Sequence, residues 1–316
     1  MADVIKKATR EGYGEALAEM AAECSRLVVL DADLSKSTKT GSFLKVCPER
    51  FINCGIAEGN MMSIAAGLAT AGLVPFASSF AMFAAGRAFE QVRNSIGYPH
   101  LNVKIGATHA GISVGEDGAT HQCNEDIALM RTIPGMTIIN PADFLEAKAA
   151  VRAAYDYEGP VYLRFGRLAV PIFSDKADAP FQIGKGVTLR KGGDVTIAAT
   201  GLPVPFALEA AELLAKEGIQ ARVLNIHTVK PLDEELILAA AAETGAIVTA
   251  EEHSIIGGLG AAVCETVCAA CPVPVVRVGV NDVYGVSGPA PELLKIYGLT
   301  AENIAQKAKE ALALKK

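Results

Sequence analysis

Short apolar segments alternate with alanine-rich segments of helical length along most of the chain. Apolar runs of strand length include residues 26–34, 51–55, 101–109, 194–201, 246–254 and 272–280. Helical patterns include residues at about 8–23, 203–217 and 301–315. Because strands that alternate with helices favour crossover connections and parallel pairing, the pattern predicts an α/β fold. We expect two doubly wound domains with largely parallel sheets.

The composition changes near the middle of the chain. From Ile172 to about Lys185 the sequence becomes polar and contains a proline within IFSDKADAPFQIGK. Such a segment is typical of a linker between packed domains. We therefore predict a first domain at residues 1–175, a linker at 176–188 and a second domain at 189–316.

Bulk properties narrow the functional classes. The chain has 316 residues, a net charge of −6 and 51% hydrophobic residues. The acidic balance argues against nucleic acid or an anionic membrane as the main partner. No apolar run is long enough to cross a bilayer, and the first residues lack a signal-peptide pattern. Seven scattered cysteines favour a reducing cytoplasm, and we interpret the cluster Cys264, Cys268 and Cys271 as thiols rather than metal ligands.

A glycine-rich, charged segment follows the apolar run at 101–109. It runs from His109 to Gln122 as HAGISVGEDGATHQ and holds two imidazoles with two carboxylates, Glu116 and Asp117. Its glycines permit backbone angles that other residues resist. Open α/β sheets bind ligands where strands end in such loops. The segment therefore predicts a functional site.

Glu58 is the only charged side chain between Arg50 and Arg87. It starts an apolar, alanine-rich helical pattern, so the first turn of a helix could support its charge. Alternatively it is a buried carboxyl with a raised pKa, as acid–base chemistry requires. Phe80 and Phe83 either belong to the core or stack on a flat ligand ring. A polar loop with Asp31, Asp33, Ser35 and Ser37 follows the first apolar strand.

Several common catalytic and nucleotide-binding patterns are absent. The sequence contains no GxxxxGK[ST] or HExxH pattern, which removes the main support for phosphate-loop and zincin chemistry. GGLGAAV, from Gly257, lacks the third glycine of a dinucleotide fingerprint, and its acidic residues precede it. We interpret it as close packing of a helix N-terminus.

Five motifs in register resemble the second half of transketolase. They are ADL with a following serine, GIAEGNM, SSFAMF, THAGISVGEDGATHQ and LRFGR, all between residues 31 and 167. VKPLDEELI and AEEHSIIGGLG resemble the family's C-terminal domain. The family's diphosphate-binding domain carries a GDG motif, which this sequence lacks. The chain is thus similar to one subunit of a split transketolase that holds the pyrimidine-binding and C-terminal domains.

The resemblance implies thiamine diphosphate chemistry of the pentose phosphate pathway type. A two-carbon ketol unit would pass from a ketose phosphate to an aldose phosphate. A partner chain, the N-terminal subunit, would supply the diphosphate-binding domain and the ligands for Mg²⁺ or Ca²⁺. Two copies of each chain would form a heterotetramer.

The resemblance also carries residue roles. Glu58 matches the glutamate that hydrogen-bonds the pyrimidine ring nitrogen, and Phe80 and Phe83 match the aromatics that pack on this ring. Asp33 matches a position near the cofactor. A third family aromatic would fall near Gly86, where this chain has none.

Further matched positions concern the sugar. Asp117 matches a residue that binds a sugar hydroxyl, and His121 matches one that contacts the reacting centre. Ser37, His109 and Arg167 match positions that hold the sugar phosphate, although Arg164 is an alternative phosphate ligand. No role is matched by three further histidines, which we interpret as structural or surface residues: His100, His227 and His253.

Three other interpretations stay open. A deoxyxylulose phosphate synthase has a similar sequence motif around GEDGATHQ, but it normally contains its own GDG domain. The β subunit of a 2-oxoacid dehydrogenase also lacks the diphosphate half, yet is not expected to show GEDGATHQ. A non-catalytic paralogue would need none of Glu58, Asp117, His121 and Arg167. We favour the transketolase interpretation.

Overall fold

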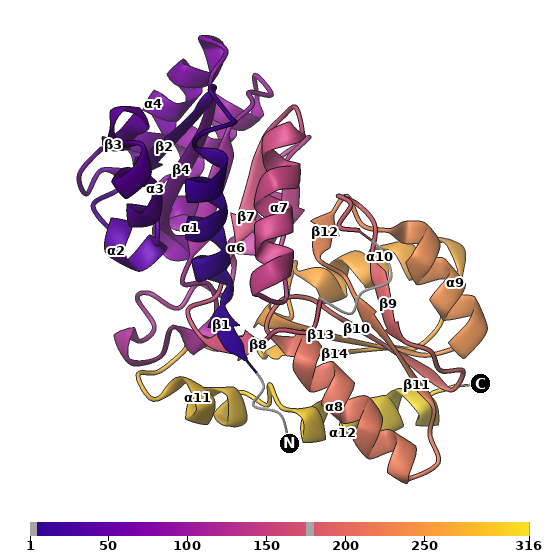
Figure 1. Cartoon of the computed structure of the whole chain (residues 1–316). Coiled ribbons are helices and arrows are strands. Elements are labelled where there is room, and N and C mark those ends of the chain that lie inside the picture. The colour runs from indigo at the N-terminus through magenta and orange to yellow at the C-terminus, as the bar shows by residue number, and fades with distance from the viewer. Residues whose placement is uncertain (1–4, 175–179, 316) are drawn as a thin grey trace.

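The computed structural model describes residues 5–174 and 180–315, which form two α/β domains (Figure 1). The sheet of the first domain has seven strands in the order β12-β6-β7-β5-β4-β2-β3, all parallel to their neighbours except β12. Its strands are β2 (Leu27–Asp31), β3 (Phe51–Asn53), β4 (Val74–Phe80), β5 (Lys104–Thr108), β6 (Thr137–Ile139), β7 (Val161–Arg164) and β12 (Thr228–Lys230).

The second sheet has five strands in the order β14-β13-β10-β11-β9, and only β9 is antiparallel to its neighbour. Its strands are β9 (Val187–Arg190), β10 (Val195–Ala199), β11 (Ala221–Asn225), β13 (Ile247–Ser254) and β14 (Val275–Val280). A separate antiparallel pair joins β1 (Lys6–Ala8) to β8 (Ala169–Pro171). The predicted class, two doubly wound and largely parallel sheets, is confirmed.

Helices cover both faces of the first sheet. Successive side chains of a strand point to opposite faces, and in β2 apolar side chains on both faces are buried. Leu27 and Val29 pack with α1, α3 and α7, whereas Val28 and Leu30 pack on the face covered by α4 and α6. The α-helices of this domain are α1 (Thr9–Met20), α2 (Ser35–Thr38), α3 (Gly41–Val46), α4 (Glu58–Thr70), α5 (Phe89–Gln91), α6 (Asp126–Arg131) and α7 (Phe144–Asp156).

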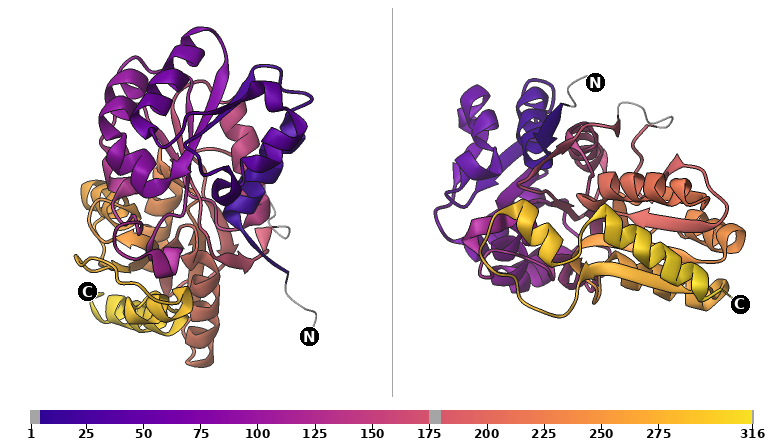
Figure 2. Two further views of the ribbon diagram at one scale, coloured as in Figure 1. Left: turned by 90° about the vertical axis from the view of Figure 1, so that its left-hand side faces the viewer. Right: turned by 90° about the horizontal axis from the view of Figure 1, so that it is seen from below.

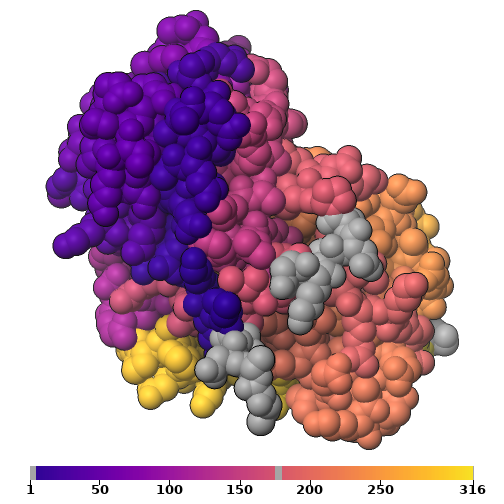
Figure 3. Space-filling view, viewed as in Figure 1, coloured from indigo at the N-terminus to yellow at the C-terminus, as the bar shows by residue number. Residues whose placement is uncertain are grey.

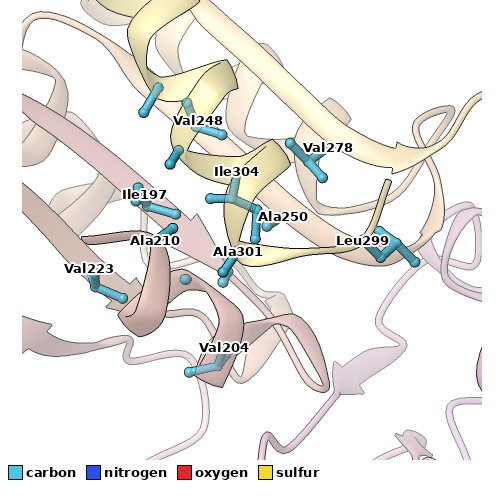
Figure 4. Close-up of a cluster of buried hydrophobic side chains, with 14 of the residues drawn as sticks. Ile197, Val204, Ala210, Val223, Val248, Ala250, Val278, Leu299, Ala301 and Ile304 are labelled. Carbon is cyan, nitrogen blue, oxygen red and sulfur yellow. The ribbon is translucent and has the colours of Figure 1, made fainter. Parts of the chain in front are cut away.

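The second domain repeats this layering. Helices α8 and α12 cover one face of its sheet, and Figure 4 shows Ile304 of α12 beside Ile197 and Val248 of the strands. Helices α9 and α10 cover the other face. The helices of this domain are α8 (Pro203–Lys216), α9 (Glu234–Thr244), α10 (Leu259–Ala270), α11 (Ala290–Ile296) and α12 (Ala301–Ala313).

One strand from the second half of the chain belongs to the sheet of the first domain. Strand β12 lies beyond the predicted linker in the sequence, yet it pairs with β6 at the edge of the first sheet. The two views of Figure 2 and the space-filling view in Figure 3 show the halves in broad contact. Part of the predicted linker, residues 176–179, lies outside the described residues, and the domain limits stay a prediction. Within the described ranges, no helix combines the length and the apolar character needed to cross a membrane.

Candidate active site

Glu58 is the first residue of α4, and its carboxyl group is buried. The side chain is 1% exposed, and Arg87 Nη1 lies 3.0 Å from each of its two carboxylate oxygens. Both interpretations of this residue therefore hold in part, since the carboxyl is buried and also lies in the first turn of a helix. The ion pair with Arg87 was not predicted from the sequence.

A stack of aromatic rings lies beside this carboxyl. The ring centroids of Phe80 and Phe83 are 5.9 Å apart with an interplanar angle of 14°, and His109 stacks on Phe80 with 3.8 Å between centroids. His121 meets Phe83 edge-on at 5.3 Å. The guanidinium carbon of Arg87 lies 4.4 Å from the centroid of Phe83, which connects the stack to the Glu58 pair.

His109 links the stack to a second group of residues. Its Nε2 lies 2.9 Å from Arg10 Nη1, and its Nδ1 lies 2.9 Å from Thr108 Oγ1. Because arginine can only donate, Nε2 accepts, and the ring hydrogen is assigned to Nδ1. Burial and the nearby cations, Arg10 first, lower the pKa of His109 to about 3. The imidazole is thus neutral, and it orients Arg10 in addition to any contact with a ligand.

Arg10 is a site residue that was not predicted from the sequence. Its Nη1 also donates to the main-chain oxygen of Ser37 at 3.0 Å, while its Nε is buried without a partner among the described residues. Burial, followed by the charge of Arg167, lowers the pKa of Arg10. Three predicted phosphate-binding positions, Ser37, His109 and Arg167, therefore gather around Arg10. No local motif marks Arg10, which lies in an ordinary helical pattern.

The structure distinguishes the two candidate arginines after β7. Arg164 is buried, and its Nε donates to Asp126 Oδ2 at 2.8 Å while its Nη2 donates to the main-chain oxygen of Glu252 at 2.8 Å. The side chain of Arg167 is 38% exposed and lies 3.2 Å from Glu116. Arg164 is thus committed to internal partners, and only Arg167 can meet a ligand from solvent.

The glycine-rich segment forms a compact loop between β5 and α6. Gly111, Gly115 and Gly118 all have positive φ angles, as their predicted conformational role requires. A Cβ at Gly111 would lie 2.5 Å from the carboxyl carbon of Glu252 in β13, so the loop lies directly against the second domain. Glu252 Oε1 accepts the Ser113 N–H at 2.6 Å.

The two predicted sugar-binding residues at the end of this loop face solvent to different degrees. Asp117 is exposed, and His121 is half-buried with its Nδ1 2.9 Å from Thr120 Oγ1. Asp33, near the predicted cofactor position, is exposed with φ 62°, and its carboxylate accepts a hydrogen bond from Asn53 at 3.0 Å. Asp31, by contrast, is buried and organises this polar loop through Thr38 Oγ1 at 2.7 Å.

The structure also describes the surroundings of the remaining histidines, the GGLG segment and the cysteines. His227 and His253 are buried, and His100 is exposed. In the GGLG segment, the carboxylate of Glu251 accepts hydrogen bonds from the N–H groups of Leu259 and Gly260, at 2.7 and 2.8 Å, at the start of α10. This confirms close packing of a helix N-terminus. All seven cysteines are free, and the described residues contain no group of three or more His, Cys, Asp and Glu that could hold a metal ion.

Comparison with known proteins identifies this arrangement. The profile of the transketolase pyrimidine-binding domain matches residues 5–172, and that of the transketolase C-terminal domain matches residues 184–304. Both are transketolase domains, and this family implies dependence on thiamine diphosphate. The chain belongs to the transketolase family.

Individual relatives match nearly the whole chain. The solved structure of a "Split gene transketolase, inactive beta4 tetramer" has a TM-score of 0.90 and 55% identity, and the match covers 98% of this chain and 99% of that one. A Methanocaldococcus jannaschii protein, provisionally named a transketolase C-terminal section, is 52% identical over 98% of this chain and 97% of its own length. A 6-deoxy-6-sulfo-D-fructose transketolase subunit from a Clostridium species is 47% identical, with coverage of 95% and 93%.

Proposed function

We propose that this chain is the subunit of a thiamine diphosphate-dependent transketolase that binds the cofactor's pyrimidine ring and the sugar substrates. It would transfer a two-carbon ketol unit from a ketose phosphate to an aldose phosphate. When bound, the cofactor supplies a nucleophilic carbon that can also hold the electrons of a broken carbon–carbon bond. The single observation that carries the proposal is a buried carboxyl, Glu58, beside a stack of aromatic rings.

The residues present fit an aminopyrimidine. Glu58 offers a carboxylate with free lone pairs in surroundings that exclude water, which suits a hydrogen bond to a ring nitrogen. Phe80 and Phe83 offer parallel faces for a flat ring. Asp33 would lie at the edge of the cofactor position, and His121 would contact the reacting end of the substrate.

The two guanidinium groups of Arg10 and Arg167 fit the anionic end of a sugar phosphate. The positive charges of Arg10 and Arg167 both lower the pKa of His109, so the two guanidinium groups lie near the same imidazole. Arg10 Nε has no hydrogen-bond partner among the described residues. Guanidinium groups bind phosphate oxygens through a fixed fork of donors. Ser37 and His109 would orient Arg10, and Asp117 would bind a sugar hydroxyl. The name of one relative specifies a sulfonated sugar, so the preferred anionic group is a matter for experiment.

This site needs a second chain to complete it. Ile56, two residues before Glu58, is 77% exposed, so an apolar side chain stands open at the edge of the site. We infer that an N-terminal transketolase subunit covers this edge and brings the diphosphate site with its Mg²⁺ or Ca²⁺ ligands. A cytoplasmic heterotetramer of two plus two chains and a role in pentose phosphate metabolism complete the proposal.

Reconstitution tests the proposal directly. The purified chain would be mixed with its candidate partner chain, thiamine diphosphate and Mg²⁺, and assayed for ketol transfer from xylulose 5-phosphate to ribose 5-phosphate. We expect activity only in the mixture, and Glu58→Gln should abolish turnover while melting at the same temperature as the wild type. Near-normal turnover of E58Q would contradict the role of Glu58. Activity with pyruvate and glyceraldehyde 3-phosphate instead would favour the synthase interpretation.

A further inference from the structure

The side chain of Arg87 joins two parts of the proposed cofactor site. Its Nη1 lies 3.0 Å from both carboxylate oxygens of Glu58, and its guanidinium carbon lies 4.4 Å from the centroid of the Phe83 ring. The arginine thus contacts both the carboxyl and one of the rings that would meet a pyrimidine. None of the sequence motifs pointed to it.

An unusual backbone segment places Arg87 there. Met82–Arg87 forms a π-helix, a conformation that is rare and frequently found at functional sites. A Cβ at Gly86 would lie 2.3 Å from Met82 Cε, so Met82 fills the space that a side chain at position 86 would need. Gly86 carries no aromatic side chain, and the group that packs on the Phe83 ring on this side of the proposed pocket is the guanidinium of Arg87.

The charges of the pair are unevenly exposed. The Glu58 side chain is 1% exposed, whereas that of Arg87 is 52% exposed. In the part of the chain that the structure describes, Arg87 is the only cationic side chain bonded to Glu58. Removal of this sole counter-ion would leave a buried, unpaired carboxylate, which costs free energy. One nitrogen bridging both oxygens also restricts rotation of the carboxyl group and leaves lone pairs free for another donor.

From this geometry we infer that Arg87 is a positioning residue for Glu58, an inference that rests on the proposed function. The guanidinium holds the Glu58 carboxyl group in one orientation, so that an oxygen lone pair stays available to the pyrimidine ring nitrogen. Arg87 acts through Glu58 and does not itself bind the ring nitrogen.

The affinity of the reconstituted complex for thiamine diphosphate, measured by calorimetry with Mg²⁺ present, tests this role. We expect Arg87→Met to weaken binding by at least about tenfold, the size typical of a lost charged hydrogen bond. Arg93 supplies a matched control, because it is exposed on the next turns and its side chain bonds only the neighbouring Asn94 among the described residues. Arg93→Met should change the affinity by less than about twofold, as expected for a surface cation.

A double-mutant cycle separates positioning from direct contact. In the E58Q background, R87M should cause no further loss of affinity, because the charge that Arg87 holds is already gone. Ethylguanidinium added to Arg87→Gly should restore binding, which a purely structural role would not allow. Equal losses in the wild-type and E58Q backgrounds, or an unaltered R87M, would overturn this inference alone. A wild-type complex that fails to bind thiamine diphosphate would overturn the proposed function with it.

Discussion

The main-chain N–H of Ser113 donates a 2.6 Å hydrogen bond to the carboxylate of Glu252, and this bond connects the two domains at the candidate site. Ser113 belongs to the glycine-rich loop, whereas Glu252 lies near the end of β13 in the second domain. Gln122 adds a second connection by donating to the main-chain oxygen of Val286 at 3.0 Å. The second domain therefore shapes the loop that carries Asp117 and His121.

Removing this carboxylate should loosen the loop. Glu252→Ala leaves the buried Ser113 N–H without an acceptor, so we expect a loss of about 1–3 kcal/mol in the free energy of unfolding. Hydrogen exchange of the Ser113 amide should become faster as well. Glu292→Ala, an exposed carboxylate in α11, is the control and should change neither quantity. Unchanged exchange at Ser113 in E252A would contradict the proposed connection.

Gly111 should tolerate alanine less well than another glycine with the same backbone angle. Gly111 has φ 81° and faces Glu252, whereas Gly72 has φ 85° and a Cβ added there would have no atom within 4 Å. Gly72→Ala should therefore cost only the left-handed backbone term, about 1–2 kcal/mol. Gly111→Ala should cost a further ~1–3 kcal/mol from overpacking. Denaturant unfolding measures both, and equal costs would refute the close approach.

Glu251 should make stability depend on pH. Burial raises its pKa from the usual 4.5 to about 7, even though two N–H groups of α10 oppose the shift. The folded state therefore binds the proton more tightly than the unfolded state. This contribution is complete below about pH 4.5 and is lost as the pH rises through about 7.

The matching variant is Glu251→Gln, which cannot titrate. The free energy of unfolding of the wild type, relative to that of E251Q, should fall by up to about 3 kcal/mol between pH 5 and pH 8. Comparing the two proteins at each pH cancels the titration of the other buried groups. A difference that stays constant over this range would show that Glu251 has no such shift.

Arg164 and Arg167 should behave in opposite ways. Arg164→Met leaves Asp126 as an unpaired buried charge, so we expect a loss of about 3–5 kcal/mol in stability. Arg167→Met removes an exposed pair with Glu116 and a hydrogen bond to the main-chain oxygen of Val114, and should cost about 1 kcal/mol.

Substrate binding should separate the same two variants. In the reconstituted complex, R167M should weaken the apparent affinity for ribose 5-phosphate by at least about tenfold, because a charge-assisted phosphate contact is lost. A stable R164M protein with weak sugar phosphate binding, next to an unaffected R167M, would reverse the assignment.

Residue patterns along the chain predicted the α/β layers of the fold and a functional site in the segment from His109 to Gln122. Leu27 and Val29 face one side of their strand and Val28 and Leu30 the other, and all four are buried, so a continuous apolar run correctly indicated a strand covered on both faces. The isolated charge of Glu58 in an apolar segment likewise indicated its burial.

Only the tertiary structure decided which distant groups meet. Arg10 lies far from His109 in sequence and in an unremarkable helical pattern, yet the fold brings the two side chains to 2.9 Å. Arg164 and Arg167 are three residues apart, but one ends a buried strand and the other follows it, so their surroundings differ completely. Local patterns report average burial and backbone preference, which depend on near neighbours. Pairing of a guanidinium with a remote carbonyl, ring or carboxylate depends on how strands and crossovers close in space, and that is why Arg10, Arg87 and Glu252 emerged only from the folded chain.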